Sequence, residues 1–440
     1  MSRLQSGVRV ACALVCAVML AAACGADGGA GSSGDIDGAA APDAASHLGD
    51  GSLGVVRVEP GEAVQIRSLN AIAGDVAFFG LPIARSVVLA IADYGPIHGF
   101  DVDLGAELDD LCSNDGGQAA AQTIVADRDV IGVVGTSCSG AAVAAAPLIT
   151  TAGMVLISGG NTSPALTSDL QGNPGANRSV GYYRTAHNDL FQGAAMAEFV
   201  YDELGIATAA AIHDGDPYTQ GLAQAFADAF EREGGTVTGL SAVNKDDTDM
   251  VPVLTEIAAA SPGALFLPLF QPAGDFIADQ ARAVPGLEDT VLVAADSLLT
   301  SHYLALPQTV GMYFSGPDTR FGDNRNQSTG RTAGDFLAAY EARYGEPPAS
   351  TFWAYGYDAT TLLLDAIAAA SYLDGDTLVV DRQGVRDSLD GVEDYQGLFG
   401  TLGCDDFGDC GAARITVVRN IGGEENVEAS LENIVFSFAP

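Results

Sequence analysis

Short apolar runs alternate along the chain with longer segments of helical pattern. The apolar residues 130–134 predict a buried strand, and residues 154–158 predict a second one. Between them, the alanine-rich residues 141–152 favour a helix, although Pro147 conflicts with it. A strand, a helix and a strand within about thirty residues form a βαβ unit, so these two strands should run parallel.

The same alternation extends in both directions from this unit. Before and after it, we expect strands at 64–69, 100–108 and 182–185, helices at 82–93 and 118–127, and a loop at 70–80. A second run has strands at 207–213, 236–242, 264–270, 291–294 and 312–315, with helices at 189–204, 218–234, 250–260 and 273–283. The last part has helices at 330–344 and 350–372, a short helix around 385–389, and strands at 398–402, 415–419 and 434–438. The pattern predicts an α/β protein with two doubly wound parallel sheets.

Two polar loops follow neighbouring strands of the central unit. One carries Ser137 and Ser139, and the other carries Gly160 and Thr162. Ligands of open α/β sheets bind at the carboxyl ends of the strands, where these loops should meet. Hydroxyl groups, unpaired amides and a helix N-terminus favour a small anion such as a carboxylate. The alternative is that the hydroxyls only cap helices.

Composition narrows the possible partners. The chain has 440 residues, 48% of them hydrophobic, and a net charge of −38, with Lys245 as its single lysine. The length allows two or three domains. An acidic surface of this kind repels nucleic acid, so we expect no nucleic-acid partner. The charge by itself indicates only a well-solvated surface.

The N-terminus has the pattern of an export signal. Arg3 and Arg9 precede an apolar core at 10–23 that is too short for a permanent membrane span, and Cys24 follows three alanines. Small residues before a cysteine resemble the bacterial lipobox, which predicts a signal peptide at 1–23 and lipidation of Cys24. The alternative is an ordinary signal peptide. Residues 24–56 should be a flexible tether, so the protein is expected outside the cytoplasm, attached to an envelope membrane.

The cysteine count agrees with export. Cys12, Cys16 and Cys24 belong to the N-terminal segment, which leaves an even number, Cys112, Cys138, Cys404 and Cys410. In an oxidising compartment these should pair, and proximity favours Cys404 with Cys410, so that Cys112 joins Cys138. A four-cysteine metal site is the weaker reading, because no Cys-x-x-Cys spacing is present.

Four motifs in order resemble the branched-chain amino-acid-binding proteins, type I periplasmic solute-binding proteins of ABC importers. They are Gly-Thr-Ser-Cys-Ser from Gly135, Leu-Ile-Ser-Gly-Gly-Asn-Thr-Ser-Pro-Ala-Leu-Thr from Leu156, Arg-Thr-Ala-His-Asn-Asp-Leu-Phe-Gln-Gly from Arg184, and Asp-Gly-Asp-Pro-Tyr-Thr-Gln-Gly from Asp214. The resemblance implies two lobes, 57–187 plus 318–413 and 188–317 plus 414–440. Three crossing segments, near His187, Pro317 and Ala413, would join them. A family disulfide also matches Cys112 with Cys138.

The resemblance implies a set of ligand contacts. Ser139 and Thr162, with the backbone of Gly160, match the groups that hold a ligand carboxylate. Asp296 matches the acid that holds an ammonium, and Asp189 matches an acid at the first crossing. Asp189 could instead cap the helix that begins there, and Asp296 could be a turn or cap residue.

Three aromatic residues complete the implied site. Tyr218 matches an aromatic residue near the ammonium, Phe270 replaces a frequent tyrosine, and Phe79 would form a wall of the side-chain pocket. Tyr218 and Phe270 could also be ordinary core residues. Asn161 stands where the family usually has a small apolar residue and Gly159 where proline is common, so the pocket is expected to be reshaped.

The sequence contains no nucleophile elbow, no Walker A lysine motif and no His-Glu-x-x-His, and its histidines lack metal-ligand spacing. We therefore expect a binding protein that is not an enzyme and uses no cofactor or metal. The resemblance implies capture of a small polar solute, an amino acid or an amide, and delivery to an ABC permease in the membrane. The alternative is a ligand sensor of the same fold that acts through a partner protein.

Overall fold

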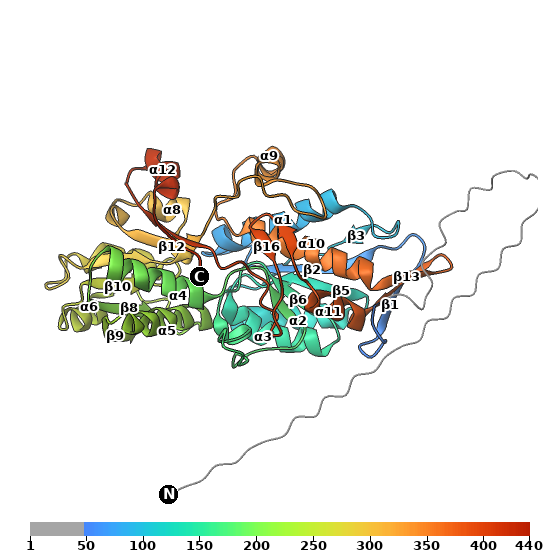
Figure 1. Cartoon of the computed structure of the whole chain (residues 1–440), viewed down its shortest axis with the longest axis horizontal. Helices are drawn as coiled ribbons and strands as arrows, with labels where there is room; N and C mark the ends of the chain where they lie inside the picture. The colour runs from blue at the N-terminus through green and yellow to red at the C-terminus, as the bar shows by residue number, and fades with distance from the viewer. Residues whose placement is uncertain (1–47) are drawn as a thin grey trace, which may run out of the picture. The chain divides into compact units, whose positions relative to one another are not determined.

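The structure, a computed structural model, describes residues 48–440, except the side chain of Glu424. The predicted signal peptide, Cys24 and most of the predicted tether lie outside these residues. The described chain builds two large sheets covered by helices (Figure 1). Their strands match the two runs of alternation in the sequence, which confirms the predicted fold class.

The first sheet is parallel and has the order β3-β2-β5-β6-β7. Its strands are β2 (Val64–Asn70), β3 (Val102–Asp103), β5 (Val130–Gly135), β6 (Val155–Ser158) and β7 (Tyr182–Arg184), and the short β4 (Leu108–Asp109) pairs with β2. Helices α1 (Ala77–Tyr94) and α10 (Trp353–Ala369) pack together, as do α2 (Asn114–Ala126) and α3 (Ser139–Thr151). Val155 and Ile157 of β6 join the core under α1 and α10, and Leu156 joins the core under α2 and α3. Helices on both faces explain why these strands are apolar throughout.

The second sheet repeats this order in its parallel part, β9-β8-β10-β11-β12, and adds the antiparallel β17 and β18. Its strands are β8 (Thr208–His213), β9 (Thr236–Ala242), β10 (Ala264–Leu267), β11 (Val291–Ala294), β12 (Tyr313–Pro317), β17 (Ile415–Arg419) and β18 (Ile434–Phe438). Its helices are α4 (Asp189–Glu198), α5 (Pro217–Arg232), α6 (Val251–Ala258), α7 (Ala273–Ala281), α8 (Ser301–Leu304) and α12 (Val427–Glu432). In both sheets the strand order reverses beside the first strand of the run, β2 or β8, which is where ligand sites form in such folds.

The chain passes between the two sheets three times. It leaves β7 at Arg184 for α4, leaves β12 at Pro317 for α9 (Ala333–Tyr344) and α10, and returns to the second sheet at Ile415. These passages fall near the predicted crossings, and we keep the predicted lobe ranges as the proposed boundaries. The terms first lobe and second lobe refer to these ranges below.

Several local predictions were wrong. Phe78 and Phe79 lie in the first turn of α1 and not in a loop, because the helix begins five residues earlier than its Pro82 signal indicated. The expected strand at 100–108 is split into β3 and β4. The expected tether overlaps β1 (Val55–Val58), which pairs with β14 (Thr377–Asp381) in a small sheet with β13 (Ser371–Asp374). The place of β1 was missed because it pairs with β14 across more than 300 residues of chain, whereas β13 and β14 form a local hairpin.

The bounds of the remaining elements were predicted only approximately. α11 (Arg382–Asp390) is longer than expected, and the predicted strand at 398–402 is a small hairpin of β15 (Tyr395–Gly397) and β16 (Gly400–Leu402). The structure pairs Cys112 with Cys138 and Cys404 with Cys410. The first pair ties the segment before α2 to the N-cap of α3, and the second closes a loop just before the third crossing.

Candidate functional site

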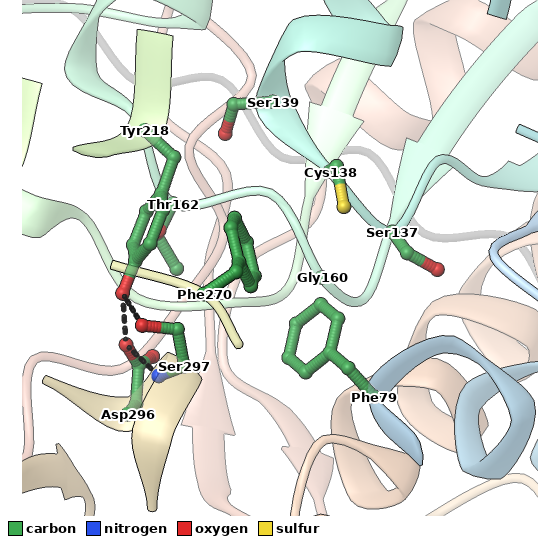
Figure 2. Close-up of a pocket in the computed structure, with 10 residues that line it drawn as sticks. All are labelled: Phe79, Ser137, Cys138, Ser139, Gly160, Thr162, Tyr218, Phe270, Asp296 and Ser297. Carbon is green, nitrogen blue, oxygen red and sulfur yellow. Dashed lines mark hydrogen bonds between the residues drawn. The ribbon is translucent and has the colours of Figure 1, made fainter. Parts of the chain in front are cut away.

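The carboxyl ends of both sheets converge on one small cavity. Seven of the eight predicted contact residues line it, and the full lining is Phe79, Ser137, Cys138, Ser139, Gly160, Thr162, Tyr218, Phe270, Asp296 and Ser297 (Figure 2). These residues follow β2, β5 and β6 of the first sheet and β8, β10 and β11 of the second. The two lobes therefore each supply one wall of the site.

The first-lobe wall is made of neutral hydrogen-bond donors. Ser139 opens α3, is 1% exposed, and its Oγ accepts the amide of Ser163 at 3.3 Å. Thr162 follows β6 and is 2% exposed. At Gly160 a Cβ would lie 2.8 Å from the Ser137 carbonyl oxygen, so only glycine lets the two loops approach this closely. Hydroxyls and amides beside a helix N-terminus favour a carboxylate.

Ser137 lines the cavity, but its hydroxyl is already engaged. It donates to Asn70 Oδ1 at 3.0 Å and accepts the Ala71 amide at 3.0 Å, so it holds the end of β2 against the end of β5. In Figure 2 its hydroxyl points away from Phe270 and the other cavity residues. Ser137 thus has a structural role, whereas Ser139 faces the site.

The second-lobe wall is acidic and aromatic. The Tyr218 hydroxyl donates to Asp296 Oδ1 at 2.7 Å and contacts Ser297 Oγ at 2.9 Å (Figure 2). Burial raises the pKa of Tyr218 well above its usual value, and Asp296 adds to the rise, so this phenol stays protonated. Ser297, which the sequence did not predict as a site residue, is uncharged, and its hydroxyl donates to Leu269 O at 2.7 Å. Asp296 is therefore oriented by neighbours that carry no positive charge.

Asp189 does not line the cavity, and it does not cap its helix either. Asn188 is the N-cap of α4, since its side chain accepts the Leu190 amide, and Asp189 is the first helical residue. Asp189 is fully buried, and neither of its carboxylate oxygens has a hydrogen-bond partner. Burial raises its pKa well above the usual range and the nearby Asp296 raises it further, while Thr162 and Arg184 oppose the rise without cancelling it. A buried carboxyl group without a partner marks a place that a cationic group would stabilise.

His187 adds no positive charge to this wall. Its Nε2 lies 2.8 Å from Gln192 Oε1 and 3.8 Å from Asp296 Oδ2. Burial lowers the pKa of His187, which keeps the imidazole neutral. The acidic pair Asp189 and Asp296 consequently has no side-chain cation within the cavity lining.

Aromatic rings separate the two walls. The Phe79 and Phe270 ring centroids are 6.4 Å apart in an edge-on arrangement, so the first and second lobes touch here. Phe79 also packs on Phe352 at 4.7 Å, and Phe270 on Tyr218 at 5.2 Å. These contacts make an apolar border beside the polar donors, a combination that is common in small-molecule sites.

Asn161 and Gly159, which depart from the family pattern, lie behind the first-lobe wall. Asn161 Oδ1 accepts from Thr136 Oγ1 at 3.2 Å and from Tyr182 Oη at 3.0 Å, so its amide group points into the first lobe. At Gly159 a Cβ would lie 2.5 Å from the Gly356 amide, so glycine permits close packing on α10. Neither residue lines the cavity, in contrast to the expectation that they reshape it.

The cavity has a volume of about 10 Å³, which is enough for about one water molecule. Phe270 also borders a larger cavity of about 490 Å³, lined by loops of both lobes. The cavity as it stands is therefore too small for a molecule the size of an amino acid. The geometry is that of a closed two-lobed site.

The comparisons with known proteins agree with this geometry. The Leu/Ile/Val-binding protein homolog 3 of Brucella melitensis biotype 1 is 25% identical over 359 residues, 81% of this chain and 91% of the relative. The leucine binding protein LivK of Thermotoga maritima has a similar fold, with a TM-score of 0.69 and 24% identity, over 81% of this chain and 95% of that one. LivJ of Streptococcus pneumoniae, solved with isoleucine, has a TM-score of 0.67 and 21% identity, over 86% of this chain and 99% of that one. The family model described as periplasmic binding protein matches residues 63–412, so the chain belongs to the periplasmic binding protein family.

Proposed function

We propose that this protein captures an α-amino acid with an apolar side chain and delivers it to an ABC importer from a lipid anchor at Cys24. The observation that carries the proposal is the division of the cavity between two chemically different walls. Ser139, Thr162 and the Gly160 backbone stand on one side, and Asp296 stands on the other. An α-amino acid has a carboxylate and an ammonium on one carbon, so it can contact both walls at once.

The first-lobe wall would hold the carboxylate. It offers neutral donors at the N-terminus of α3, and the described cavity lining contains no basic side chain that would make a counter-ion. Amides and hydroxyls at a helix N-terminus stabilise a carboxylate without such a counter-charge. The site therefore suits the carboxylate of a zwitterion, whose own ammonium supplies the balancing charge.

The second-lobe wall would hold the ammonium. Asp296 would accept the ammonium directly. Asp189 lies close enough to Asp296 for the charge of Asp296 to raise the pKa of Asp189. An ammonium bound to Asp296 would also favour the ionised form of Asp189, which lies next to Asp296 behind the cavity lining. This charge arrangement supports an amino acid over a simple carboxylic acid.

Phe79 and Phe270 would receive the ligand side chain. Their rings are apolar and come from opposite lobes, so they enclose the side chain only after closure. The Brucella relative is named for leucine, isoleucine and valine, and the pneumococcal structure contains isoleucine, which supports a branched aliphatic side chain.

Hinge closure would couple binding to delivery. The ligand first contacts the neutral wall, and the second lobe then closes and adds the contact to Asp296. A ligand shifts this equilibrium only through contacts that the open state lacks, and Asp296 and Phe270 are such contacts. The permease would recognise the closed, loaded protein.

A thermal-shift screen of the purified protein tests the ligand class. The panel contains the aliphatic amino acids, their amides, urea, and the matching carboxylic acids without an amino group. A ligand at one hundred times its Kd adds about 2.7 kcal/mol to the free energy of unfolding, so a true ligand gives a clear rise in Tm. We expect leucine, isoleucine or valine to give the largest rise. A rise only with ligands that lack the ammonium would contradict the proposal.

The anchor is tested separately. Cys24→Ser should move the protein from the membrane fraction to the soluble fraction of cells that express it, because a lipidated cysteine would be lost. Cys16→Ser, which lies within the predicted signal, is the matched control and should leave the protein in the membrane fraction. Membrane retention of Cys24→Ser would overturn the lipid anchor and leave the binding proposal intact.

A further inference from the structure

A fully buried arginine lies directly behind the first-lobe wall. Arg184 ends β7, at the first crossing, and is 0% exposed. Its Nη2 donates to Asp409 Oδ2 at 2.6 Å and to Thr167 Oγ1 at 2.8 Å, and its Nη1 donates to the carbonyl oxygen of Ser163 at 2.7 Å. Burial alone would lower the pKa of Arg184, but Asp409, together with Tyr182 and Asp189, raises it above its usual value, so the guanidinium stays charged.

The carbonyl that Arg184 holds belongs to Ser163, a residue that contacts both lobes. The Ser163 amide donates to the Oγ of Ser139, a predicted carboxylate contact. The Ser163 hydroxyl donates across the cleft to the carbonyl oxygen of Pro217, next to Tyr218, at 2.9 Å. Arg184 therefore holds Ser163, the residue that contacts both Ser139 and the second lobe.

Asp409 joins this arrangement to the start of the second lobe. Besides Arg184, its carboxylate accepts the Nδ2 of Asn188 at 2.9 Å and the hydroxyl of Thr167 at 3.2 Å. Asn188 is the N-cap of α4, the helix that begins at the first crossing. One carboxylate thus connects the first crossing, the loop after β6 and the segment that leads to the third crossing.

Asp409 comes from the loop that the Cys404–Cys410 disulfide closes. This loop pairs with the free edge of the first sheet, because the Arg184 amide donates to Gly408 O and the Cys410 amide donates to Arg184 O, both at 2.9 Å. At Gly408 a Cβ would lie 2.2 Å from the carbonyl oxygen of Tyr182, so the loop lies tightly against β7. The disulfide limits the conformations of the segment that presents Asp409.

We infer that Arg184 and Asp409 are positioning residues of the ligand site, and that the Cys404–Cys410 loop holds Asp409 in place. The pair touches no part of the cavity and acts through Ser163 and Asn188. It fixes the carboxylate-binding loop relative to the crossing segment around which the lobes close. The binding readout of this inference rests on the proposed function, whereas the second readout, amide hydrogen exchange, does not depend on the ligand.

The test uses three variants of the full chain. Asp409→Asn removes the counter-charge of Arg184, and Cys404→Ser with Cys410→Ser opens the loop but keeps both charges, so it stays informative if Asp409→Asn fails to fold. Asp93→Asn is the matched control, since Asp93 also pairs with an arginine, Arg331, in the first lobe but outside the cavity lining. All three are measured well below their Tm.

The first readout is the Kd for L-leucine by calorimetry. We expect a rise of at least about tenfold for Asp409→Asn and of about threefold to tenfold for the double serine variant, with no change for Asp93→Asn. The second readout is amide hydrogen exchange at 161–168 in the ligand-free protein. It should speed up in the two loop variants and stay unchanged in Asp93→Asn.

The outcomes distinguish the positioning role of Arg184 and Asp409 from the proposed ligand. Unchanged exchange at 161–168 in folded loop variants overturns the positioning role, whatever the Kd does. Faster exchange with an unchanged Kd for L-leucine also overturns it, because the loop would then be mobile without consequence for the site. If L-leucine does not bind the unmodified protein, the proposed ligand is wrong, and the exchange measurement alone decides the inference.

Discussion

The two walls of the cleft differ in chemistry and in how they are built. The first-lobe wall consists of neutral donors, Ser139, Thr162 and the Gly160 backbone, at the ends of two adjacent strands. The second-lobe wall consists of Asp296, Tyr218 and Ser297, which are joined by hydrogen bonds among themselves. On the proposed closure, the ligand would contact the first wall in the open state, and the second wall would contribute only when the lobes meet.

This difference assigns the two walls separate tasks. Neutral donors can hold a carboxylate in the open state without an unpaired protein charge, which would be costly to bury. Asp189 and Asp296 form an acidic pair with no cation in the cavity lining, so on the proposed function the ligand's ammonium would complete the closed state. Changes in the second wall should therefore cost more affinity than changes in the first.

The largest effect is expected from Asp296→Asn. This change keeps the side-chain shape but removes the charge that faces the ammonium, and a hydrogen bond to a charged group is worth about 1.5–3 kcal/mol. The Kd for L-leucine should rise by about ten- to a hundredfold in a calorimetric titration. Asp228→Asn, on the exposed side of α5, is the control and should leave the Kd unchanged. Equal Kd values for both variants would remove Asp296 from the site.

Asp189→Asn tests the acidic pair through pH. The folded-state pKa of Asp189 is raised, so the folded protein keeps a proton that the unfolded chain loses at about pH 4. The free energy of unfolding of the ligand-free protein should then fall with rising pH above that value, by at most about 1.4 kcal/mol per pH unit. Asp189→Asn should remove this contribution, seen as a flatter pH dependence in denaturant titrations.

The pH dependence of ligand affinity should have the opposite sign to the pH dependence of stability. An ammonium favours the ionised form of Asp189, so the affinity of the unmodified protein for L-leucine should increase with pH over the range in which Asp189 titrates. In Asp189→Asn the affinity should be lower and less dependent on pH. An unchanged pH profile of both stability and binding would show that Asp189 has no part in the acidic pair.

Ser139→Ala should have a smaller effect, because it removes one neutral donor while the Gly160 backbone and Thr162 remain. The loss of one hydrogen bond of about 1 kcal/mol corresponds to a Kd raised about fivefold. The effect should be larger for L-leucine than for L-leucinamide, which has no carboxylate. Equal effects on the two ligands would place the carboxylate elsewhere.

Gly140→Ala should act on closure and have the smallest effect. A Cβ at Gly140, in α3, would lie 2.3 Å from Asp216 Oδ2 of the second lobe, whose carboxylate caps α5. The added methyl group should disfavour the closed state and raise the Kd severalfold. Combining it with Asp216→Ser, which shortens the side chain but keeps a cap, should restore the affinity. No recovery in the double variant would indicate that the methyl group disturbs α3 itself.

The fold and most of the first wall were predictable from local sequence. Apolar runs such as residues 130–134 become strands covered on both faces, and the loops after adjacent parallel strands must lie together. The position of Phe79 in a helix was not predictable, because Val76 gives no side-chain cap and Pro82 suggested a later start.

The second wall and the support of the first depend on contacts between distant parts of the chain. Tyr218 and Asp296 were placed through the family resemblance, whereas Ser297 has no sequence signal beyond its neighbour. Arg184 and Asp409 are 225 residues apart, and neither has a local pattern that indicates a buried ion pair. Only the return of the chain at the third crossing brings them together.

The central claim is that the ligand's carboxylate lies on the first lobe and its ammonium on the second. The most direct measurement is a crystal structure of the protein with the amino acid that gives the largest thermal shift. The account predicts the carboxylate within hydrogen-bond distance of Ser139 and Thr162, the ammonium on Asp296, and the side chain between Phe79 and Phe270. A ligand bound in the reverse orientation, or outside this cavity, would contradict it.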